Sequence, residues 1–377
     1  MKRITLIAVL LFSAVSAFAQ HYTVDVENPE MLRFADFREP ARKEIVLPSQ
    51  VNGYNVYKSD LHTHSVYSDG TVTPQFRVKE AWLDGLDVIA VTEHIEYRPF
   101  ETEMAGYLGM KGEMNTDLNA AVKVAQKEAE YWDIFIIPGT EITRHGTTVG
   151  HFNALFTTDN NKIPHDDPVQ AIRNAKKQGA LVQHNHPGWI RTNIDYTETE
   201  KIAYDEGLID GVEVMNFYEF YPGIIDRVQD KGLFIAAGTD VHAASASKYR
   251  HGGNMRTMTL ILAKEKTLES VREALEARRT LALGFETICG EEQLLKDFFA
   301  AGIKVSVIRK SSKNIHLAVT NMTSITYVLT RPGENPVRLA PFYTVWYPVP
   351  LTATTLDLTV LNMFCAKDKH PVVSLTF

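Results

Sequence analysis

Cysteine is scarce in this chain, since only Cys289 and Cys365 occur among its 377 residues. Two cysteines are too few for a disulfide scaffold or for a zinc site made of thiolates. Any metal chemistry must therefore use histidine and carboxylate side chains. In an oxidising compartment we expect the two cysteines to form a disulfide that ties together the two domains predicted below.

Long apolar runs are missing apart from one at the N-terminus. Two basic residues precede an apolar stretch over residues 4–15, and the small-residue pattern Ala17-Phe18-Ala19 follows. The stretch is shorter than the roughly 20 residues that span a bilayer, and its order is typical of a secretory signal peptide. We therefore expect residues 1–19 to be removed and the mature protein to be exported, either periplasmic or secreted, with no membrane segment.

An excess of positive charge is also absent. The chain has 39 basic and 46 acidic residues, a formal net charge of −7. Removal of residues 1–19 takes away two basic residues and no acidic one, which leaves 37 basic and 46 acidic residues and a net charge of −9. A surface this acidic gives no reason to expect nucleic acid or anionic lipid as a partner.

Short β-type runs alternate with amphipathic stretches over residues 54–284, after a lead-in segment over residues 20–53. The expected strands cover residues 56–61, 88–92, 134–138, 152–156, 181–183, 211–214, 233–237 and 257–262. The expected helices cover residues 74–83, 118–130, 168–178 and 268–278. This alternation of strands and helices predicts an α/β barrel.

The pattern changes after Gly284. A short helical run over residues 291–300 is followed by closely spaced β-type segments with turn residues between them. The segments cover residues 303–308, 315–319, 325–329, 343–347, 356–361 and 372–377. We therefore expect a small antiparallel β-sandwich domain over residues 285–377, and the length of the chain allows two domains at about 150 residues each.

Histidine and acidic side chains gather where the expected barrel strands end. In chain order they are His62, His64, Asp69, His94, Glu141, His151, His184, His186, Asp240 and His242. The carboxyl ends of barrel strands meet at one mouth, so we expect these side chains to lie close together. Side chains on a strand repeat every second residue, and His62 and His64 can therefore bind one ion together.

The residue types in this group predict metal binding. Imidazoles with a few carboxylates suit zinc, manganese or iron better than calcium, which prefers oxygen ligands. A lone histidine is more often a surface or core residue than a ligand. Six of these histidines together with the three acids, at successive strand ends, favour a metal centre instead.

The ordered motifs resemble those of the PHP (polymerase and histidinol phosphatase) domain phosphoesterases. They are Asp60-Leu61-His62-Thr63-His64-Ser65 with Ser68-Asp69-Gly70, Thr92-Glu93-His94, Gly139-Thr140-Glu141, His186-Pro187 and Gly238-Thr239-Asp240-Val241-His242. The resemblance covers residues 54–284 and implies a distorted (β/α)7 barrel with two or three divalent metal ions. One departure is Glu93, where the family usually has Asp. We expect it to matter little, because the neighbouring His94 is the ligand.

The resemblance also implies a ligand set for each ion. The first ion would be bound by His62, His64, Glu141 and Asp240, the second by Glu141, His151 and His186, and the third by Asp69, His94 and His242. Two alternatives stay open: His184 lies close to His186, which its place before Pro187 favours, and His145 lies close to His151. The residues expected to act in catalysis are His62, His64, Glu141, Asp240 and His242.

The expected reaction is hydrolysis of a small phosphate monoester or diester by a metal-bound hydroxide. Divalent ions lower the pKa of bound water towards about 7, so no serine or cysteine nucleophile is required. Candidates for phosphate binding lie in loops beyond the motifs, and each could equally be a solvated surface charge: they are Arg191, Lys248 and Arg250, with Arg144 and Arg256 as further candidates.

Four aromatic residues follow the expected strand over residues 211–214. They are Phe217, Tyr218, Phe220 and Tyr221. They could line the mouth of the barrel and stack on a sugar or base, or belong to the core or to a domain contact.

Two other functions stay open on the sequence alone. The same ions could activate water for attack on a non-phosphate bond such as an amide. Alternatively, the barrel could have lost catalysis while the β domain binds an envelope polymer, although the intact set of nine ligand candidates opposes this. The β domain itself is not expected to take part in the chemistry, because every candidate ligand lies before Gly284.

Overall fold

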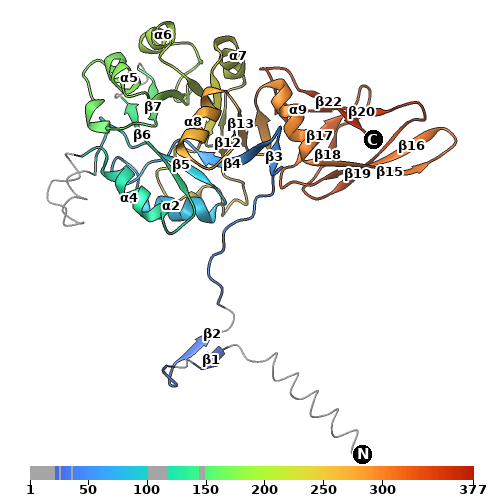
Figure 1. Cartoon of the computed structure of the whole chain (residues 1–377), viewed down its shortest axis with the longest axis horizontal. Coiled ribbons are helices and arrows are strands. Elements are labelled where there is room, and N and C mark those ends of the chain that lie inside the picture. Colours follow the sequence, from blue (N-terminus) through green and yellow to red (C-terminus); the bar gives the residue numbers. More distant parts are fainter. Residues whose placement is uncertain (1–21, 25–26, 35–36, 101–116, 144–148) are drawn as a thin grey trace, which may run out of the picture. The chain divides into compact units, whose positions relative to one another are not determined.

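The computed structural model describes residues 22–24, 27–34, 37–100, 117–143 and 149–377 (Figure 1). The chain divides between Ala41 and Arg42 into two units. In the first unit, β1 (Tyr22–Val24) pairs antiparallel with β2 (Leu32–Phe34). The predicted signal peptide lies outside the described residues, and none of the helices described is long and apolar enough to cross a membrane.

A curled, mixed sheet forms the larger part of the second unit. Its hydrogen-bonded order is β10 (Glu219–Phe220), β9 (Gly211–Asn216), β8 (Leu181–Asn185), β7 (His151–Leu155), β6 (Phe135–Thr143), β5 (Val88–Val91), β4 (Tyr54–Asp60), β12 (Met258–Ala263), β13 (Thr280–Gly284), β14 (Thr287–Cys289) and β21 (Met363–Phe364). Two strands lie off this path: β11 (Phe234–Gly238) pairs with β9, and β3 (Gln50–Val51) pairs with β4.

The directions of the strands explain why the barrel is distorted. The runs β4–β5–β6 and β8–β9–β11 are parallel, whereas β7 is antiparallel to both of its neighbours and β12 is antiparallel to β4. Within the described residues, no backbone ladder joins β11 to β12. The Thr259 hydroxyl lies between these two strands instead, 2.8 Å from the amide nitrogen and 2.9 Å from the carbonyl oxygen of Ala237. The prediction of a distorted α/β barrel is confirmed.

Six helices of the described residues belong to the barrel. They are α2 (Pro74–Leu83), α4 (Ala120–Ala129), α5 (Pro168–Lys177), α6 (Glu198–Asp205), α7 (Pro222–Lys231) and α8 (Leu268–Glu276). Local sequence sets where they begin: Thr73 caps α2 ahead of a proline, and Thr197 forms a capping box with Glu200 at the start of α6. In Figure 1, α5, α6 and α7 lie along one side of the sheet, and α2 and α4 lie along another.

The C-terminal part consists of α9 (Glu292–Ala301) and two antiparallel sheets. The first sheet contains β15 (Ile303–Lys310), β16 (Asn314–Asn321) and β19 (Thr344–Pro350), and the second contains β18 (Val337–Leu339), β17 (Tyr327–Thr330), β20 (Thr355–Val360) and β22 (Val372–Thr376). Buried residues alternate along β16 and β20, and their inward side chains, such as Leu317 and Leu358, join one hydrophobic cluster. The predicted C-terminal antiparallel β domain is confirmed.

The barrel and the β domain are continuous in structure. The strand β14 pairs with β13 on one side and with β21 on the other, so the barrel sheet extends into the C-terminal part. The hydrophobic cluster that contains Leu317 also contains Leu260 and Leu281 of the barrel and Phe298 of α9. The two parts therefore bury apolar surface against each other.

Cys289 and Cys365 are free thiols, so the predicted disulfide is wrong. Cys289 lies opposite Phe364 in the register of β14 and β21, and successive residues of an extended chain point to opposite faces. Cys289 and Phe364 accordingly pack in one hydrophobic cluster, and Cys365 belongs to another. The Cys365 thiol donates a weak hydrogen bond to the carbonyl oxygen of Lys369, at 3.4 Å.

Candidate metal centre

Backbone hydrogen bonds beyond the ends of the strands build the mouth of the barrel. The Asp240 amide donates to the His62 carbonyl at 3.0 Å, and the His64 amide donates to the Val241 carbonyl at 3.2 Å. The segment after β4 thus pairs with the segment after β11. This pairing brings the two histidines of the first motif beside Asp240 and His242.

The first predicted ligand set is assembled around two carboxylates. The Oδ1 atom of Asp240 lies 3.2 Å from Nε2 of His62 and 3.0 Å from Nε2 of His64. The two oxygens of Glu141, in β6, lie 3.5 Å from the same two nitrogens. His62, His64 and Glu141 are fully buried, whereas the Asp240 side chain is 20% exposed. The cluster therefore opens to solvent on the Asp240 side.

Glu141 also faces the second predicted ligand set. Its Oε1 atom lies 3.3 Å from Nδ1 of His151 and 3.9 Å from Nε2 of His186. Because β7 is antiparallel to its neighbours, its first residue, His151, lies at the mouth. The side-chain amide of Asn185 donates a hydrogen bond to Oε1 of Glu141 at 2.9 Å and holds that carboxylate in place. His145, the alternative to His151, lies outside the described residues.

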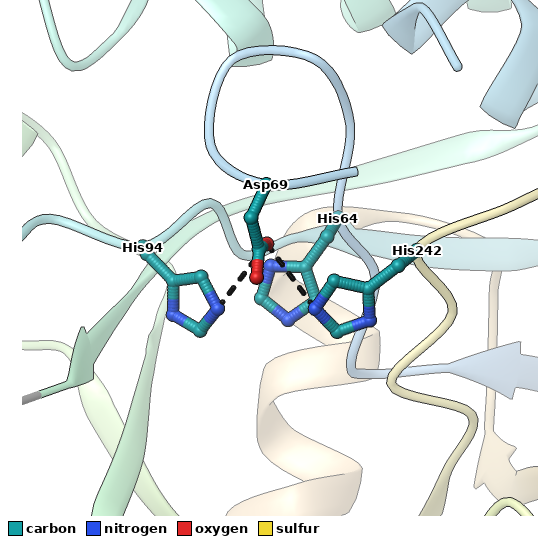
Figure 2. A group of neighbouring side chains, drawn as sticks. All are labelled: His64, Asp69, His94 and His242. Carbon is teal, nitrogen blue, oxygen red and sulfur yellow. Dashed lines mark ion pairs between the residues drawn. The ribbon is translucent and has the colours of Figure 1, made fainter. Parts of the chain in front are cut away.

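The third predicted set lies around Asp69 (Figure 2). The Oδ1 atom of Asp69 is 3.4 Å from Nε2 of His94 and 3.1 Å from Nε2 of His242. The His64 ring stacks on both imidazoles, with centroid separations of 4.3 Å to His94 and 4.5 Å to His242. His64 therefore stands in this group as well as in the first, a sharing that the sequence reasoning did not foresee.

The structure brings eight of the nine candidate ligands into three overlapping groups, within each of which the nitrogen and oxygen atoms lie within 4.8 Å of one another. These groups are His64, Asp69, His94 and His242; His62, Glu141 and His186; and His62, His64 and Asp240. The ninth, His151, lies outside these groups and contacts Glu141. Several inward atoms are buried and have no hydrogen-bond partner: Nε2 of His62, Nε2 of His64, Oδ1 of Asp69 and Oε2 of Glu141. Buried polar atoms rarely go without partners, and divalent ions would supply them here. The residues thus fit a centre with several metal ions.

A buried carboxylate that the sequence reasoning missed supports His62 from behind. The Oε1 atom of Glu213, in β9, lies 3.0 Å from Nδ1 of His62. Glu213 also accepts hydrogen bonds from the His186 amide and from the Asn216 side chain, each at 2.9 Å. The sequence did contain an indication of this role, because Glu213 is a single acid within the apolar run over residues 211–214. A carboxylate that is fully buried in such a strand needs hydrogen-bond partners.

Glu93, the residue at which the motif departs from the family pattern, orders the loop that carries Asp69. Its carboxylate accepts hydrogen bonds from the Ser65 hydroxyl at 2.5 Å and from the Ser68 hydroxyl at 2.6 Å. Gly70 closes this loop, and a Cβ atom there would lie 2.7 Å from the backbone nitrogen of Ser65. The Glu93 carboxylate thus stabilises the loop, and the neighbouring His94 faces the centre.

Burial and mutual charge set the protonation of the cluster. Burial, helped by the nearby charge of His94, lowers the pKa of His64 to about 3, and burial likewise lowers the pKa of His186 to about 3. Burial also opposes the charge on His94, but Glu141 and Asp69 together outweigh it and raise the pKa of His94 to about 10. Burial alone would raise the pKa of Glu141, yet the histidines hold it well below its usual range. Ionised carboxylates and neutral imidazoles are the forms that bind metal. His64 and His186 are therefore already in the binding form, whereas an ion that binds at His94 would have to displace its proton.

His184 is not part of the centre. Its Nδ1 atom lies 3.0 Å from the Tyr204 hydroxyl, and its Nε2 atom lies 3.0 Å from Oε1 of Glu200. His184 and His186 are two residues apart, but the backbone of His186 turns into the left-handed region, with φ of 25°. Of the two alternatives, His186 is therefore the one that joins the cluster.

The cations proposed for phosphate binding have other partners in this structure. Arg191 pairs with Glu200 at 2.5 Å, and Arg250 pairs with Asp84 at 3.0 Å. The ammonium of Lys248 lies 5.4 Å from the centre of an aromatic ring. Their contact with a phosphate stays a prediction.

Arg256 is a buried structural cation. Its guanidinium binds Oδ2 of Asp60 at 2.7 Å and Oδ2 of Asp84 at 3.2 Å. Burial alone would lower the pKa of Arg256, but the nearby carboxylates, with Asp60 foremost, outweigh it and raise the pKa above its usual value. Arg256 thus ties the first strand of the centre to the end of α2, while Arg144 lies outside the described residues.

Of the four aromatic residues after β9, Phe220 has the expected role of a domain contact, and stacking of the others on a substrate stays a prediction. Phe220 packs against Phe364 of the C-terminal part, with ring centroids 5.2 Å apart. Tyr218 is 69% exposed. Phe217 packs edge-on against Tyr249 at 5.4 Å.

Comparison with known proteins agrees with this architecture. The model of the PHP domain family matches residues 60–250. A solved structure from Bacteroides vulgatus, described as a two-domain protein containing a predicted PHP-like metal-dependent phosphoesterase, is 34% identical with a TM-score of 0.82, and the match covers 90% of this chain and 100% of that chain.

Other similarities are more distant. A histidinol phosphate phosphatase from Lactococcus lactis, solved with zinc, histidinol and phosphate, is 17% identical with a TM-score of 0.25, over 50% of this chain and 87% of that chain. An uncharacterized protein of Methanocaldococcus jannaschii is 24% identical over 176 residues, which are 46% of this chain and 62% of that protein. The chain thus matches about three fifths of the length of this curated relative.

Proposed function

This chain belongs to the PHP domain family, and we propose that it hydrolyses a small phosphate monoester or diester with two or three divalent metal ions. One observation carries the proposal. Three overlapping ligand groups meet at the mouth of the barrel, and they contain buried imidazole and carboxylate atoms that have no hydrogen-bond partner. Such atoms are what a cluster of zinc, manganese or iron ions would need.

Neighbouring side chains orient the ligands of this centre. Ions bound there would lower the pKa of a water molecule and neutralise the charge of a phosphate. Glu213 accepts a hydrogen bond from Nδ1 of His62 and so directs Nε2 towards the ions. Asn185 orients Glu141 by its hydrogen bond. The partly exposed side chains of Asp240 and His242 mark the side from which a substrate would enter.

Charge supports a phosphate as the substrate. The three ligand groups contain three carboxylates, Asp69, Glu141 and Asp240. Three divalent ions exceed their negative charge, which leaves a positive centre suited to an anionic phosphoryl group. An uncharged amide would gain less from such a centre, so we place phosphate ester hydrolysis first.

The experiment is a release assay with the full chain, depleted of metal and then loaded with manganese or zinc. We expect inorganic phosphate from small monoesters, or alcohol from diesters, and none of either from the Glu141→Ala variant. Hydrolysis of amides with no action on phosphate esters would show a non-phosphate hydrolase. A metal-loaded protein that turns over neither, but binds an envelope polymer, would show a binding protein.

We further propose that the protein works after export, periplasmic or secreted. The support is the order of charged, apolar and small residues over residues 1–19. The mass of the mature chain recovered outside the cytoplasm should correspond to loss of these residues. A full-length chain confined to the cytoplasm would contradict export and leave the proposed reaction untouched.

A further inference from the structure

A large aromatic side chain lies beside the metal centre. The ring of Trp189 has its centroid 5.5 Å from that of His151 and 5.4 Å from that of His186. Both histidines belong to the second predicted ligand set, yet Trp189 remains 40% exposed. Aromatic walls beside a few polar groups are typical of small-molecule sites.

The chain around Trp189 is held in an unusual conformation. His186 and Ile190 have positive φ values of 25° and 47°. The Trp189 amide donates to the His186 carbonyl at 2.9 Å, which closes a tight turn. A Cβ atom on Gly188 would lie 2.5 Å from the Tyr221 ring, so the turn sits directly on that ring. Non-glycine residues keep such φ values where their surroundings hold them, and these places are often functional.

A buried ion pair anchors the end of this turn. The guanidinium of Arg191 binds both oxygens of Glu200, at 3.1 and 2.5 Å. Glu200 is fully buried and also pairs with His184. Burial would raise the pKa of Glu200, but His184 and Arg191 lower it to about 2, so the pair is ionised at neutral pH. Arg191 thus anchors the end of the turn that carries Trp189, and its positive charge is already paired with Glu200.

A second aromatic ring lies beside the centre. Tyr97 is 38% exposed, and its ring centroid is 6.1 Å from that of His94. With the phosphate on the ions, the rest of the substrate would meet these rings. Flat rings pair with tryptophan and tyrosine at centroid separations of about 4.5 to 7 Å, in offset or edge-on geometry.

We propose that Trp189 is a specificity-determining residue that stacks on the substrate, and that the preferred substrate is a phosphate ester of an alcohol carrying a flat aromatic ring. The proposal rests on the function proposed above. Arg191 is a positioning residue for Trp189 and takes no direct part in phosphate binding.

The test compares two esters with the same number of carbon atoms, benzyl phosphate and cyclohexylmethyl phosphate. We expect the metal-loaded full chain to prefer benzyl phosphate in kcat/KM by a factor on the order of ten, the upper end of an aromatic pair. Trp189→Ala should abolish the preference, and Trp189→Phe should keep most of it. Trp346→Ala, which removes a tryptophan that is 75% exposed in β19, is the matched control and should keep the full preference.

Binding provides a readout that does not depend on turnover. Benzylphosphonate should bind more tightly than cyclohexylmethylphosphonate to the wild type but not to Trp189→Ala, with equal metal content in both proteins. Arg191→Ala should reduce the preference for the aromatic ligand while inhibition by inorganic phosphate stays unchanged. Weaker phosphate inhibition in Arg191→Ala would make this arginine a phosphate ligand and overturn its positioning role.

The two proposals fail in different ways. Equal kcat/KM and equal binding for the flat and the puckered ring in the wild type would overturn the role of Trp189 and leave phosphate ester hydrolysis intact. A preference that survives Trp189→Ala would do the same. No hydrolysis of any phosphate ester by the metal-loaded protein would overturn the proposed function, and this inference with it.

Discussion

The Nδ1 atom of His62 lies 3.0 Å from Oε1 of Glu213, and both side chains are fully buried. This contact fixes the ring so that Nε2 points towards Asp240 and Glu141. We expect Glu213→Gln to weaken metal binding by roughly 10- to 100-fold, because a neutral amide polarises the imidazole less than a carboxylate does. Calorimetric titration of the metal-depleted protein measures this.

The chain offers a matched control for that variant. Glu200 is also a fully buried carboxylate bonded to a buried histidine, His184, which lies outside the three ligand groups. Glu200→Gln should therefore leave the metal affinity unchanged. An equal loss of affinity in the two variants would point to general destabilisation and contradict the role given to Glu213.

Glu141 and Asp69 should differ in how many ions their loss removes. Glu141 lies among the first and second ligand sets and contacts only Nδ1 of His94 in the third. Asp69 faces Nε2 of His94 and of His242, both in the third set. Glu141→Ala should therefore lower the metal content by two ions per chain, and Asp69→Ala should lower it by one. Elemental analysis of metal-replete protein is the measurement. A single ion in the wild type, or unchanged content in Glu141→Ala, would contradict the multinuclear centre.

Arg256 should be important for stability. Its removal leaves Asp60 and Asp84 without their buried cation. Breaking a buried pair from one side typically costs about 3–5 kcal/mol, and we expect Arg256→Met to lower the free energy of unfolding by that amount. Denaturant unfolding would show it. Arg331→Met, at the more exposed pair with Glu334, is the control and should cost about 0–1 kcal/mol.

A chain that ends at Gly284 should not fold into a stable barrel. The strand β14 and the helix α9 cover barrel residues such as Leu281, and one hydrophobic cluster contains side chains from both parts. Their removal would expose this surface to water. We expect the shortened chain to aggregate or to lack a cooperative melting transition in calorimetry. A soluble, metal-binding product would contradict this prediction, and its activity would then test the expectation that the β domain takes no part in the chemistry.

Local sequence chemistry explains what could be predicted. The helix expected over residues 74–83 coincides with α2, because Thr73 and the proline after it mark a helix start by their own side chains. Most strands of the barrel were placed within a few residues by their apolar runs. The convergence of the ligands followed from their places at strand ends, as with Glu141 in β6 and His186 after β8.

What could not be predicted depends on how strands pair. Apolar runs carry no sign of direction, so nothing in the sequence showed that β7 runs antiparallel and presents its first residue, His151, to the mouth. The face of a residue depends on register, which is why the expected pairing of Cys289 with Cys365 was wrong. Glu213 was missed because its partner, His62, is distant in sequence.

The Thr259 hydroxyl between β11 and β12 has a consequence for local unfolding. Where a side chain replaces a backbone ladder, opening breaks few hydrogen bonds, so amides at this junction should exchange with deuterium early. Asp240 and His242 come just after β11. They face His62 and His64, which come just after β4. Ions shared between these segments would oppose the opening by mass action. Metal loading should therefore slow deuterium uptake at Ala237 more than at amides on the far side of the barrel.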